Sequence, residues 1–361
     1  MDKITFGLLG SGWRADFYRR VAEALPERFH LSAVWTHSPG RTAELQAAWN
    51  VPVFDSLEAF LAHGGFRFAV VCLNRAAAPE YTARLAERDI PVLAETPPAA
   101  DLHGLRALWE RLGAQTARVQ VAEQYAFQPM HAARLALARS GRLGNISHVQ
   151  VSAAHDYHGV SLMRGLLGAG FGPAAVRGVK LTAPLAIGPG RSGPPAGEGT
   201  AESEQTLAVF DFGGKTGVYD FAKEQYFSWI RNSRTLIRGE RGEIVNQEAS
   251  WLEHYDSPVY AELRRVDAGH GGNLEGLFLK GILCGSEWLY RNPFAPTRLT
   301  EDEIAVAESL VRMDEFVRGG PPVYTLAEAC QDQYLALAMH EAVLKGTEIV
   351  TEPQVWAPTG N

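Results

Sequence analysis

Short apolar runs alternate with amphipathic stretches over the first 121 residues of the chain. Residues 4–9, 31–35 and 68–73 are almost entirely apolar, and a stretch with helical spacing follows each of these runs. Strands that are apolar on both sides are typical of a parallel sheet with helices on both faces. We therefore predict an α/β domain whose further strands lie at residues 53–55, 91–94 and 118–121, with helices at 10–25, 41–49, 56–64, 79–88 and 102–112.

The pattern changes after residue 123. Residues 145–154 alternate between apolar and polar positions as a half-buried strand does, and the turn Phe-Gly-Gly-Lys-Thr-Gly at residues 212–217 favours antiparallel neighbours. The Pro- and Gly-rich residues 183–199 are expected to form a mobile loop. We predict a second, α+β domain with a large open, mainly antiparallel sheet, with strands at 145–154, 176–182, 204–212, 216–221, 234–238 and 243–246 and helices at 129–140, 301–318 and 326–344.

Composition agrees with a two-domain globular chain. Its 361 residues exceed one ordinary core, so we expect a Rossmann-type domain at residues 1–122 and a second domain at 123–361. The net charge of −7 gives no general attraction to nucleic acid or to anionic membranes. Three dispersed cysteines, the lack of a membrane-length apolar run and a start without a secretory signal favour a cytoplasmic protein.

The strongest local motif follows the first apolar run. Gly10, Gly12 and Ala15 form GxGxxA where a strand meets a helix. The first glycine permits a tight turn, the second lets the backbone approach a pyrophosphate, and the alanine allows close packing of helix on strand. In the context of alternating strands and helices, this spacing predicts a dinucleotide site.

The second strand does not end in the acidic residue that would bind a ribose 2′-hydroxyl. Thr36, His37 and Ser38 stand there instead, and Arg41 follows. None of these side chains repels a 2′-phosphate, and several can donate hydrogen bonds to one. The pattern leans slightly to NADP over NAD, although Arg41 is also explained as a solvated residue at a helix start.

Several segments in order resemble the glucose–fructose oxidoreductase/inositol dehydrogenase (Gfo/Idh/MocA) family. They are the GxGxxA start, AVWTHSPGRTAELQ, LNRAAAPEYTARLAERDIPVLAETPPA, SGRLGNISHVQV, HGVSLMRGLLG and YTLAEACQDQYLALAMHEAVLKGTEIV. The resemblance implies a Rossmann domain and an open-faced α+β domain through whose sheet homodimers or homotetramers form. It also implies nicotinamide-dependent oxidation or reduction of a sugar, a cyclitol or a related small molecule.

The resemblance also locates the expected chemistry and a departure from it. The family's Glu-Lys-Pro motif reads Glu95-Thr96-Pro97, so the lysine that polarises the substrate is replaced by an uncharged residue. The family's histidine corresponds to His158, but Ala154 and Ser161 stand where aspartates are usual. Proton transfer is then expected from the segment of residues 155–158. The candidate catalytic residues are His158, Thr96, Asp156 and Tyr157.

With the resemblance, the cofactor site extends along the ends of several strands. The segment of residues 155–158 also offers metal ligands, but its spacing matches no closed zinc motif, and we expect no metal. The residues expected to bind the dinucleotide are Gly10, Ser11, Gly12, Trp13, Arg14, Thr36, His37, Ser38, Arg41, Leu73, Asn74, Glu95, Thr96 and Gln124.

These observations favour an NAD(P)-dependent oxidoreductase acting on a sugar, a cyclitol or a related small polyol or carbonyl compound. The missing lysine keeps two alternatives open. One is a non-catalytic nucleotide-binding sensor or regulator, and the other is a redox-assisted lyase or glycosidase with a tightly bound nucleotide. A polar aromatic cluster suits either a sugar or a subunit interface: Tyr226, Trp229, Arg231, Asn232 and Arg234.

Overall fold

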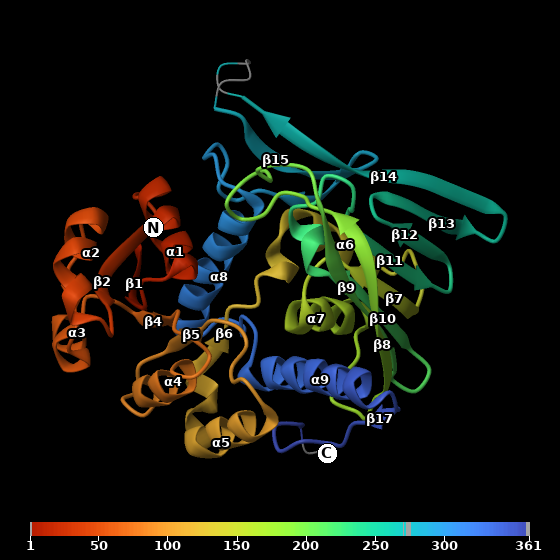
Figure 1. The fold of residues 1–361 in the computed structure, drawn as a ribbon. Coiled ribbons are helices and arrows are strands. Elements are labelled where there is room, and N and C mark those ends of the chain that lie inside the picture. The colour runs from red at the N-terminus through yellow and green to blue at the C-terminus, as the bar shows by residue number, and fades with distance from the viewer. Residues whose placement is uncertain (1, 270, 272–275, 359–361) are drawn as a thin grey trace. The chain divides into compact units, whose positions relative to one another are not determined.

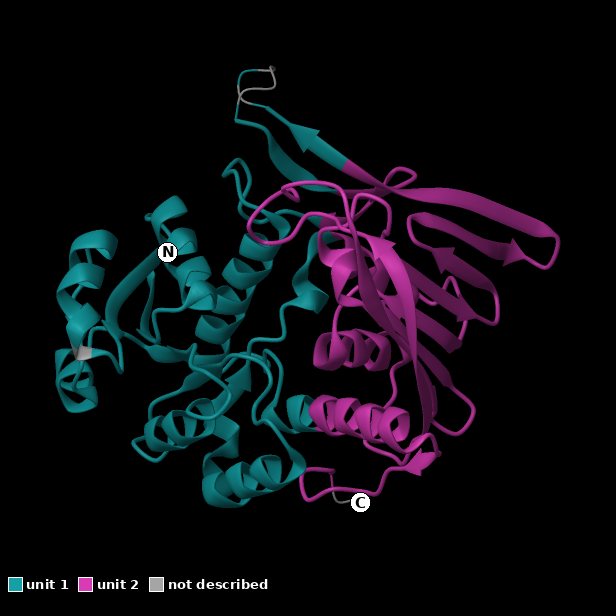
Figure 2. Cartoon of the chain, viewed as in Figure 1, with its two compact units in different colours: residues 1–129, 266–281, 291–330 teal, residues 130–265, 282–290, 331–361 magenta. Residues whose placement is uncertain are grey.

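The computed structural model describes residues 2–269, 271 and 276–358 (Figure 1). The chain forms two compact units (Figure 2). Unit 1 contains residues 1–129, 266–281 and 291–330, and unit 2 contains residues 130–265, 282–290 and 331–361. Each unit thus gathers separate segments of the chain, and the predicted single boundary between residues 122 and 123 stays a prediction.

Unit 1 is built on a six-stranded sheet in the order β3-β2-β1-β4-β5-β6, with every pair parallel. This confirms the predicted parallel sheet. Its central residues, such as Phe6, Leu8 and Val70, are fully buried, as the apolar runs require. The strands are β1 (Ile4–Leu9), β2 (Phe29–Trp35), β3 (Val53–Phe54), β4 (Phe68–Val71), β5 (Val92–Ala94) and β6 (Val119–Val121).

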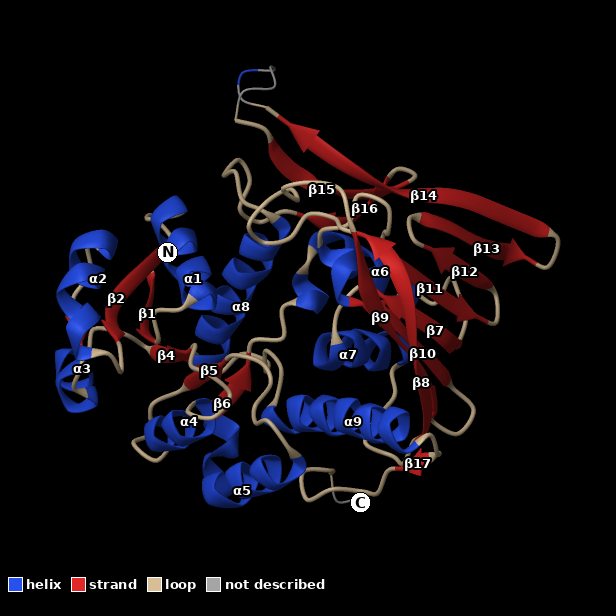
Figure 3. Cartoon of the chain, viewed as in Figure 1, coloured by secondary structure: helices blue, strands red, loops and turns tan. Residues whose placement is uncertain are grey.

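Helices flank this sheet (Figure 3), and α3, α5 and α8 each begin with a side-chain cap. The Ser56 and Asp101 side chains accept hydrogen bonds from the first turns of α3 and α5, and Thr300 and Glu303 form a capping box on α8. Helix α8 comes from the far end of the sequence and packs on α1. The helices are α1 (Trp13–Ala24), α2 (Thr42–Trp49), α3 (Leu57–His63), α4 (Ala78–Ala86), α5 (Leu102–Leu112) and α8 (Glu301–Val317).

The second sheet has 11 strands in the order β16-β15-β14-β13-β12-β11-β7-β10-β9-β8-β17. It is mainly antiparallel, as predicted. Among the described strand pairs, only β7–β10 is parallel. The unit boundary passes through β14, β15 and β16. The strands are β7 (Ile146–Ser152), β8 (Ala175–Ala186), β9 (Thr200–Asp211), β10 (Thr216–Ala222), β11 (Arg234–Gly239), β12 (Gly242–Val245), β13 (Glu248–His254), β14 (Ser257–Ala268), β15 (Phe278–Cys284), β16 (Glu287–Arg291) and β17 (Ile349–Val350).

The two faces of this sheet differ within unit 2. One face packs on α6 (Pro129–Arg139), α7 (Asp156–Leu167) and the later part of α9 (Leu326–Lys345) (Figures 1 and 3). Phe210 and Tyr219 are buried on that side. The other face carries exposed apolar side chains, among them Val179, Leu181 and Val209, which are 46%, 47% and 42% exposed. This uncovered face agrees with the predicted open sheet, whose alternating strands leave one face without helices.

One predicted loop is shorter than expected. Residues 183–186 belong to β8, which pairs with β9 as far as Ala186 opposite Thr200, so only residues 187–199 connect the two strands. The prediction of a loop over the whole of residues 183–199 was wrong at this end. Backbone pairing with β9 keeps these residues in the strand although they include Pro184 and their side chains are largely exposed.

Candidate functional site

A tight turn follows the first strand of unit 1. Gly10 has φ +115°, and its amide donates to the Trp35 carbonyl at 2.8 Å. A Cβ at this position would overlap the carbonyl oxygen of Cys72. Both facts restrict the position to glycine, as the sequence motif predicts.

The helix after this turn begins with an unfilled space. Gly12 is the N-cap of α1 with no side-chain cap, and a Cβ built on it would have no atom within 4 Å. Ala15 is fully buried against the sheet. The first amides of a helix lack intrahelical acceptors and carry the positive end of its dipole, so the open space suits a diphosphate. The residues therefore fit a dinucleotide.

The carboxyl ends of the parallel strands lie level with one another. The register pairs Leu9 with both Trp35 and Val71, Val71 with Ala94, and Ala94 with Val121. Residues that follow these positions share one edge of the sheet, which is where such sheets bind ligands. That edge gathers most of the expected cofactor residues: Gly10, Ser11, Gly12, Trp13, Arg14, Thr36, His37, Ser38, Leu73, Asn74, Glu95, Thr96 and Gln124.

A fixed ionic cluster lies at the end of β5. The Glu95 carboxylate accepts hydrogen bonds from Arg14 Nε at 2.9 Å, from the Tyr18 hydroxyl at 2.6 Å and from the Thr96 amide at 3.4 Å. Burial and the neighbouring Glu95 charge raise the pKa of Tyr18 well above its usual range. Burial alone would lower the pKa of Arg14, but the Glu95 charge raises it above its ordinary value, so the guanidinium stays charged.

Two buried polar atoms at this edge have no hydrogen-bond partner in the described part of the chain. They are Nη2 of Arg14 and Oε1 of Gln124, whose residue is only 7% exposed. Asn74, by contrast, is engaged, because its Oδ1 accepts from the amides of Ala76 and Ala77 at the start of α4. Buried donors and acceptors are normally satisfied, so Arg14 and Gln124 fit contacts to a bound molecule.

The end of β2 presents donors without a carboxylate. Thr36 is buried, and its hydroxyl accepts from the Ser38 amide at 3.3 Å. His37 and Ser38 are exposed, and the Arg41 side chain is 52% exposed with its Nε 4.0 Å from Glu44. This arrangement fits either form of the nucleotide ribose, with or without a 2′-phosphate.

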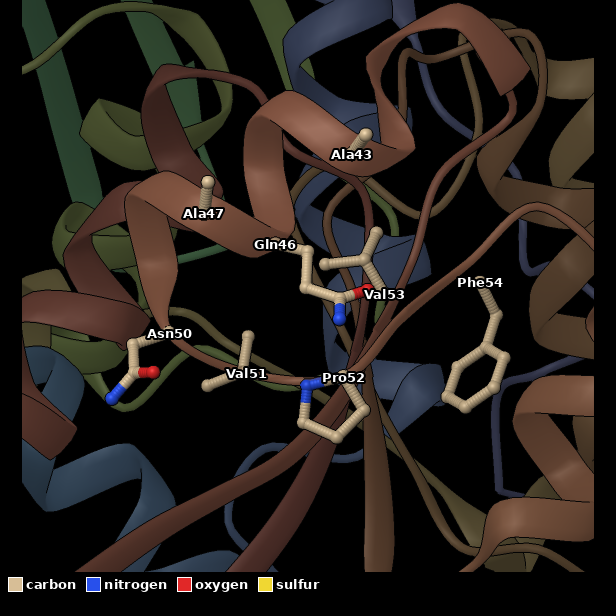
Figure 4. A pocket seen from close by; sticks show the side chains of 8 residues that line it. All are labelled: Ala43, Gln46, Ala47, Asn50, Val51, Pro52, Val53 and Phe54. Atoms are coloured by element: carbon tan, nitrogen blue, oxygen red, sulfur yellow. The ribbon is translucent and has the colours of Figure 1, made fainter.

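A hollow of about 740 Å³ lies between α2 and β3 (Figure 4). No ionisable side chain lines it, so it offers no acid, base or charge to a reaction. Its lining residues are Ala43, Gln46, Ala47, Asn50, Val51, Pro52, Val53 and Phe54.

In unit 2, the predicted catalytic segment forms the start of α7. His158 is 8% exposed, and its ring meets the rings of His155 and Tyr157 edge-on at centroid distances of 5.2 and 5.3 Å. His155 is the N-cap, and its Nδ1 lies 2.6 Å from the Tyr226 hydroxyl. The structure thus places His158 in an aromatic setting with a second imidazole beside it.

Asp156 is held in an unusual conformation by residues far away in the sequence. Its φ is +39°, in the left-handed region, and its amide donates to the Tyr219 hydroxyl at 2.9 Å. Its carboxylate lies 3.1 Å from Nε2 of His340 on α9. Burial first, and then the Asp156 charge, raise the pKa of Tyr219 well above its usual range, so this hydroxyl stays protonated. Strained backbone of this kind clusters at functional sites.

Sequence reasoning missed Tyr219 and His340. Tyr219 reads as an ordinary inward position of a strand, and His340 as a polar position of an amphipathic helix, so no local signal marks either one. Among the described residues, no three His, Cys, Asp or Glu side chains gather as metal ligands.

The residues of the predicted aromatic cluster differ in their partners and exposure. Tyr226 contacts His155, whereas Trp229 is 72% exposed. Arg234 donates to Asp220 at 2.7 Å, and the Asn232 carbonyl accepts from Gln225. The exposed Trp229 is compatible with an interface, whereas Tyr226 contacts His155 at the start of α7.

The glycine turn and the parallel sheet agree with the comparison with known proteins. Residues 4–123 match the GFO_IDH_MocA family model, described as an oxidoreductase family with an NAD-binding Rossmann fold. Residues 4–123 are a Gfo/Idh/MocA domain. The predicted family is thereby confirmed, and with it an NAD-binding oxidoreductase domain. No curated protein sequence matches this chain.

Solved structures share the fold beyond this domain. A levoglucosan dehydrogenase in complex with NADH and levoglucosan is 15% identical with a TM-score of 0.70, and covers 98% of this chain and 100% of its own. A myo-inositol dehydrogenase from Corynebacterium glutamicum is 15% identical with a TM-score of 0.65 and the same coverage. An oxidoreductase from Agrobacterium radiobacter, in complex with NAD⁺, L-tartaric acid and magnesium, is 16% identical with a TM-score of 0.66, and covers 96% of this chain and 98% of its own. The chain therefore shares its fold with these proteins over nearly its whole length.

No helix in the described part of the chain is long and apolar enough to cross a membrane.

Proposed function

We propose that the protein is a cytoplasmic NAD(P)-dependent oxidoreductase that acts on a sugar, a cyclitol or a related small polyol or carbonyl compound. The observation that carries the proposal is the open space before α1, where Gly12 leaves room at the carboxyl edge of a parallel sheet. The Gfo/Idh/MocA match supports the nicotinamide nucleotide, and the names of the similar structures support a polyol-like substrate.

In this proposal the backbone between Gly10 and Arg14 holds the diphosphate, and the end of β2 holds the adenosine ribose. The absence of a carboxylate directly after β2 leans slightly to NADP. The nicotinamide, when bound near Glu95-Thr96-Pro97, supplies the hydride acceptor or donor. The Thr96 side chain carries no charge. Its hydroxyl can hydrogen-bond to the nicotinamide ribose or to the substrate.

His158 is the proposed proton donor or acceptor. Imidazole suits proton transfer near neutral pH, and the His155 ring beside it adds a second ionisable group. Asp156 and Tyr157 flank it as further candidates at the start of α7. A His158→Asn variant should lose at least about a hundredfold in turnover while its nucleotide binding stays intact, which parallel activity and binding assays would measure.

Gly12→Leu tests the cofactor site. Thermal unfolding of the full chain is followed with NAD⁺, NADH, NADP⁺ and NADPH, each at about a hundred times its Kd, which should stabilise the wild type by about 2.7 kcal/mol. The variant should fold normally, since no atom lies within 4 Å of the new Cβ, yet it should lose this stabilisation. Gly172→Leu, at another open glycine, is the matched control and should keep it. A wild type that binds none of the four nucleotides and carries none from expression would overturn the proposal.

The ionic cluster favours one second candidate, a nucleotide-binding sensor without turnover. Thr96 is uncharged, and Glu95 is engaged by Arg14, Tyr18 and the Thr96 amide, so the end of β5 offers no ready acid or base. Nucleotide binding with no hydride exchange across a polyol panel would favour the sensor. Nucleotide that co-purifies and shows no net absorbance change during turnover would instead favour a redox-assisted lyase or glycosidase.

A further inference from the structure

A cavity of about 680 Å³ lies within unit 2, between the first turn of α7 and the last turns of α9. Neighbouring strands supply its floor. The register pairs Lys180 with Thr206, and Thr206 with Phe221, so all three side chains lie on the face of the sheet that packs on α7 and α9. Val343 and Leu344 of α9 add an apolar wall.

The opposite wall is a preorganised polar pair. The Asp156 backbone is fixed by its hydrogen bond to Tyr219, and its carboxylate meets His340 Nε2 at 3.1 Å. The two side chains are still 41% and 52% exposed, so a ligand can reach both. The Asp156 carboxylate keeps acceptor lone pairs for neighbouring hydroxyl groups, and the imidazole beside it is a second polar partner, as a polyol requires.

One lysine that lines the cavity has no carboxylate partner among the residues that the structure describes. Lys180 forms an ion pair with Glu204 at 3.2 Å, and the Asp156 carboxylate lies 3.1 Å from His340 Nε2. Lys223, which follows β10 and lines the cavity, has no carboxylate within 4.0 Å in the described part of the chain. One ammonium without an ion-pair partner suits one carboxylate, whereas a dianionic phosphate would place a second negative charge near Asp156 and Glu204.

We propose that this cavity binds a polyhydroxylated monocarboxylate, that is, a sugar acid. Its hydroxyl groups bond to Asp156 and His340, its carboxylate lies at Lys223, and its C–H face rests on Val343 and Leu344. That the sugar acid is the substrate rests on the proposed function, whereas its binding to the cavity does not.

Calorimetric titration of the full chain without nucleotide tests the inference. D-Gluconate is compared with the neutral polyol D-glucitol and with 6-phosphogluconate. The wild type should bind gluconate about three- to tenfold more tightly than glucitol, as one exposed charge-assisted contact allows. Lys223→Met should remove this difference and leave glucitol binding unchanged, and His340→Gln should weaken both. Lys280→Met, at an exposed lysine outside the cavity lining, is the control.

Any of four results would overturn the inference: no binding of gluconate, equal binding of gluconate and glucitol, tighter binding of 6-phosphogluconate than of gluconate, or a preference for the acid that survives Lys223→Met. The nucleotide titration with Gly12→Leu reports on a different unit. If the nucleotide titration fails, the oxidoreductase proposal is wrong but the sugar-acid site is unaffected. If the gluconate titration fails, the sugar-acid site is wrong but the oxidoreductase proposal is unaffected.

Discussion

His131, buried in α6, should make the protein progressively less stable in mild acid. It is 7% exposed, and its Nδ1 lies 3.1 Å from Nη1 of Arg134, which can only donate, so Nδ1 accepts this hydrogen bond. Burial first, and then the Arg134 charge, lower the pKa of His131 to about 3. The folded protein therefore keeps this imidazole neutral where the unfolded chain, with a pKa of about 6.5, would protonate it.

The sign and size follow from proton linkage. Below about pH 6.5 the unfolded state binds a proton that the folded state refuses, so stability falls as the pH falls. Each pH unit costs about 1.4 kcal/mol, which gives about 2 kcal/mol at pH 5 and about 5 kcal/mol by the folded pKa of about 3, below which this contribution levels off.

Urea unfolding of wild type and His131→Gln between pH 7.5 and pH 5 measures the effect. The glutamine side chain offers an acceptor to Arg134 without titrating, so the variant should lose less stability than the wild type by about 2 kcal/mol across this range. His254→Gln, at an exposed histidine of the same unit, should follow the wild type. A difference between wild type and His131→Gln that stays constant with pH would refute the reasoning.

Two further predictions concern stability and assembly. Asp332→Ala leaves Arg164 buried without the carboxylate now 2.6 Å from its Nε, and because these side chains are 0% and 4% exposed, urea unfolding should show a loss of about 3–5 kcal/mol. An unchanged midpoint would contradict the burial of the pair. Val209→Glu places a charge on the open face of the 11-stranded sheet, so the proposed homodimer or homotetramer should dissociate in sedimentation velocity, and an oligomer that persists would exclude this face as the interface.

The parallel sheet could be predicted because its strands are buried on both faces. Val70 and its neighbours in β4 have no exposed side, so an apolar run marks the strand directly. Strand β14 lacks such a signal, because exposed and half-buried positions follow one another along almost its whole length and only Leu263 is buried. Its pairing with β13 through backbone hydrogen bonds depends on tertiary structure, and the sequence pattern showed neither strand.

The nucleotide cradle could likewise be located from local sequence, since Gly10 and Gly12 act through the backbone of a single turn. The polar pair at the start of α7 could not. Asp156 was among the candidates, but its partner His340 lies on another helix, and the backbone strain depends on a hydroxyl from β10. Contacts of this kind arise only when distant segments fold together.

The Arg14–Glu95–Tyr18 arrangement bears on how the proposed reaction would respond to acidity. Neither the guanidinium nor the phenol exchanges a proton under physiological conditions, because the pKa of each lies above its ordinary value. A hydride delivered at that strand end would then meet a guanidinium that stays charged and a phenol that stays neutral. Proton transfer is proposed for His158 at the start of α7, so hydride and proton would be handled by parts of the chain that fold around different sheets.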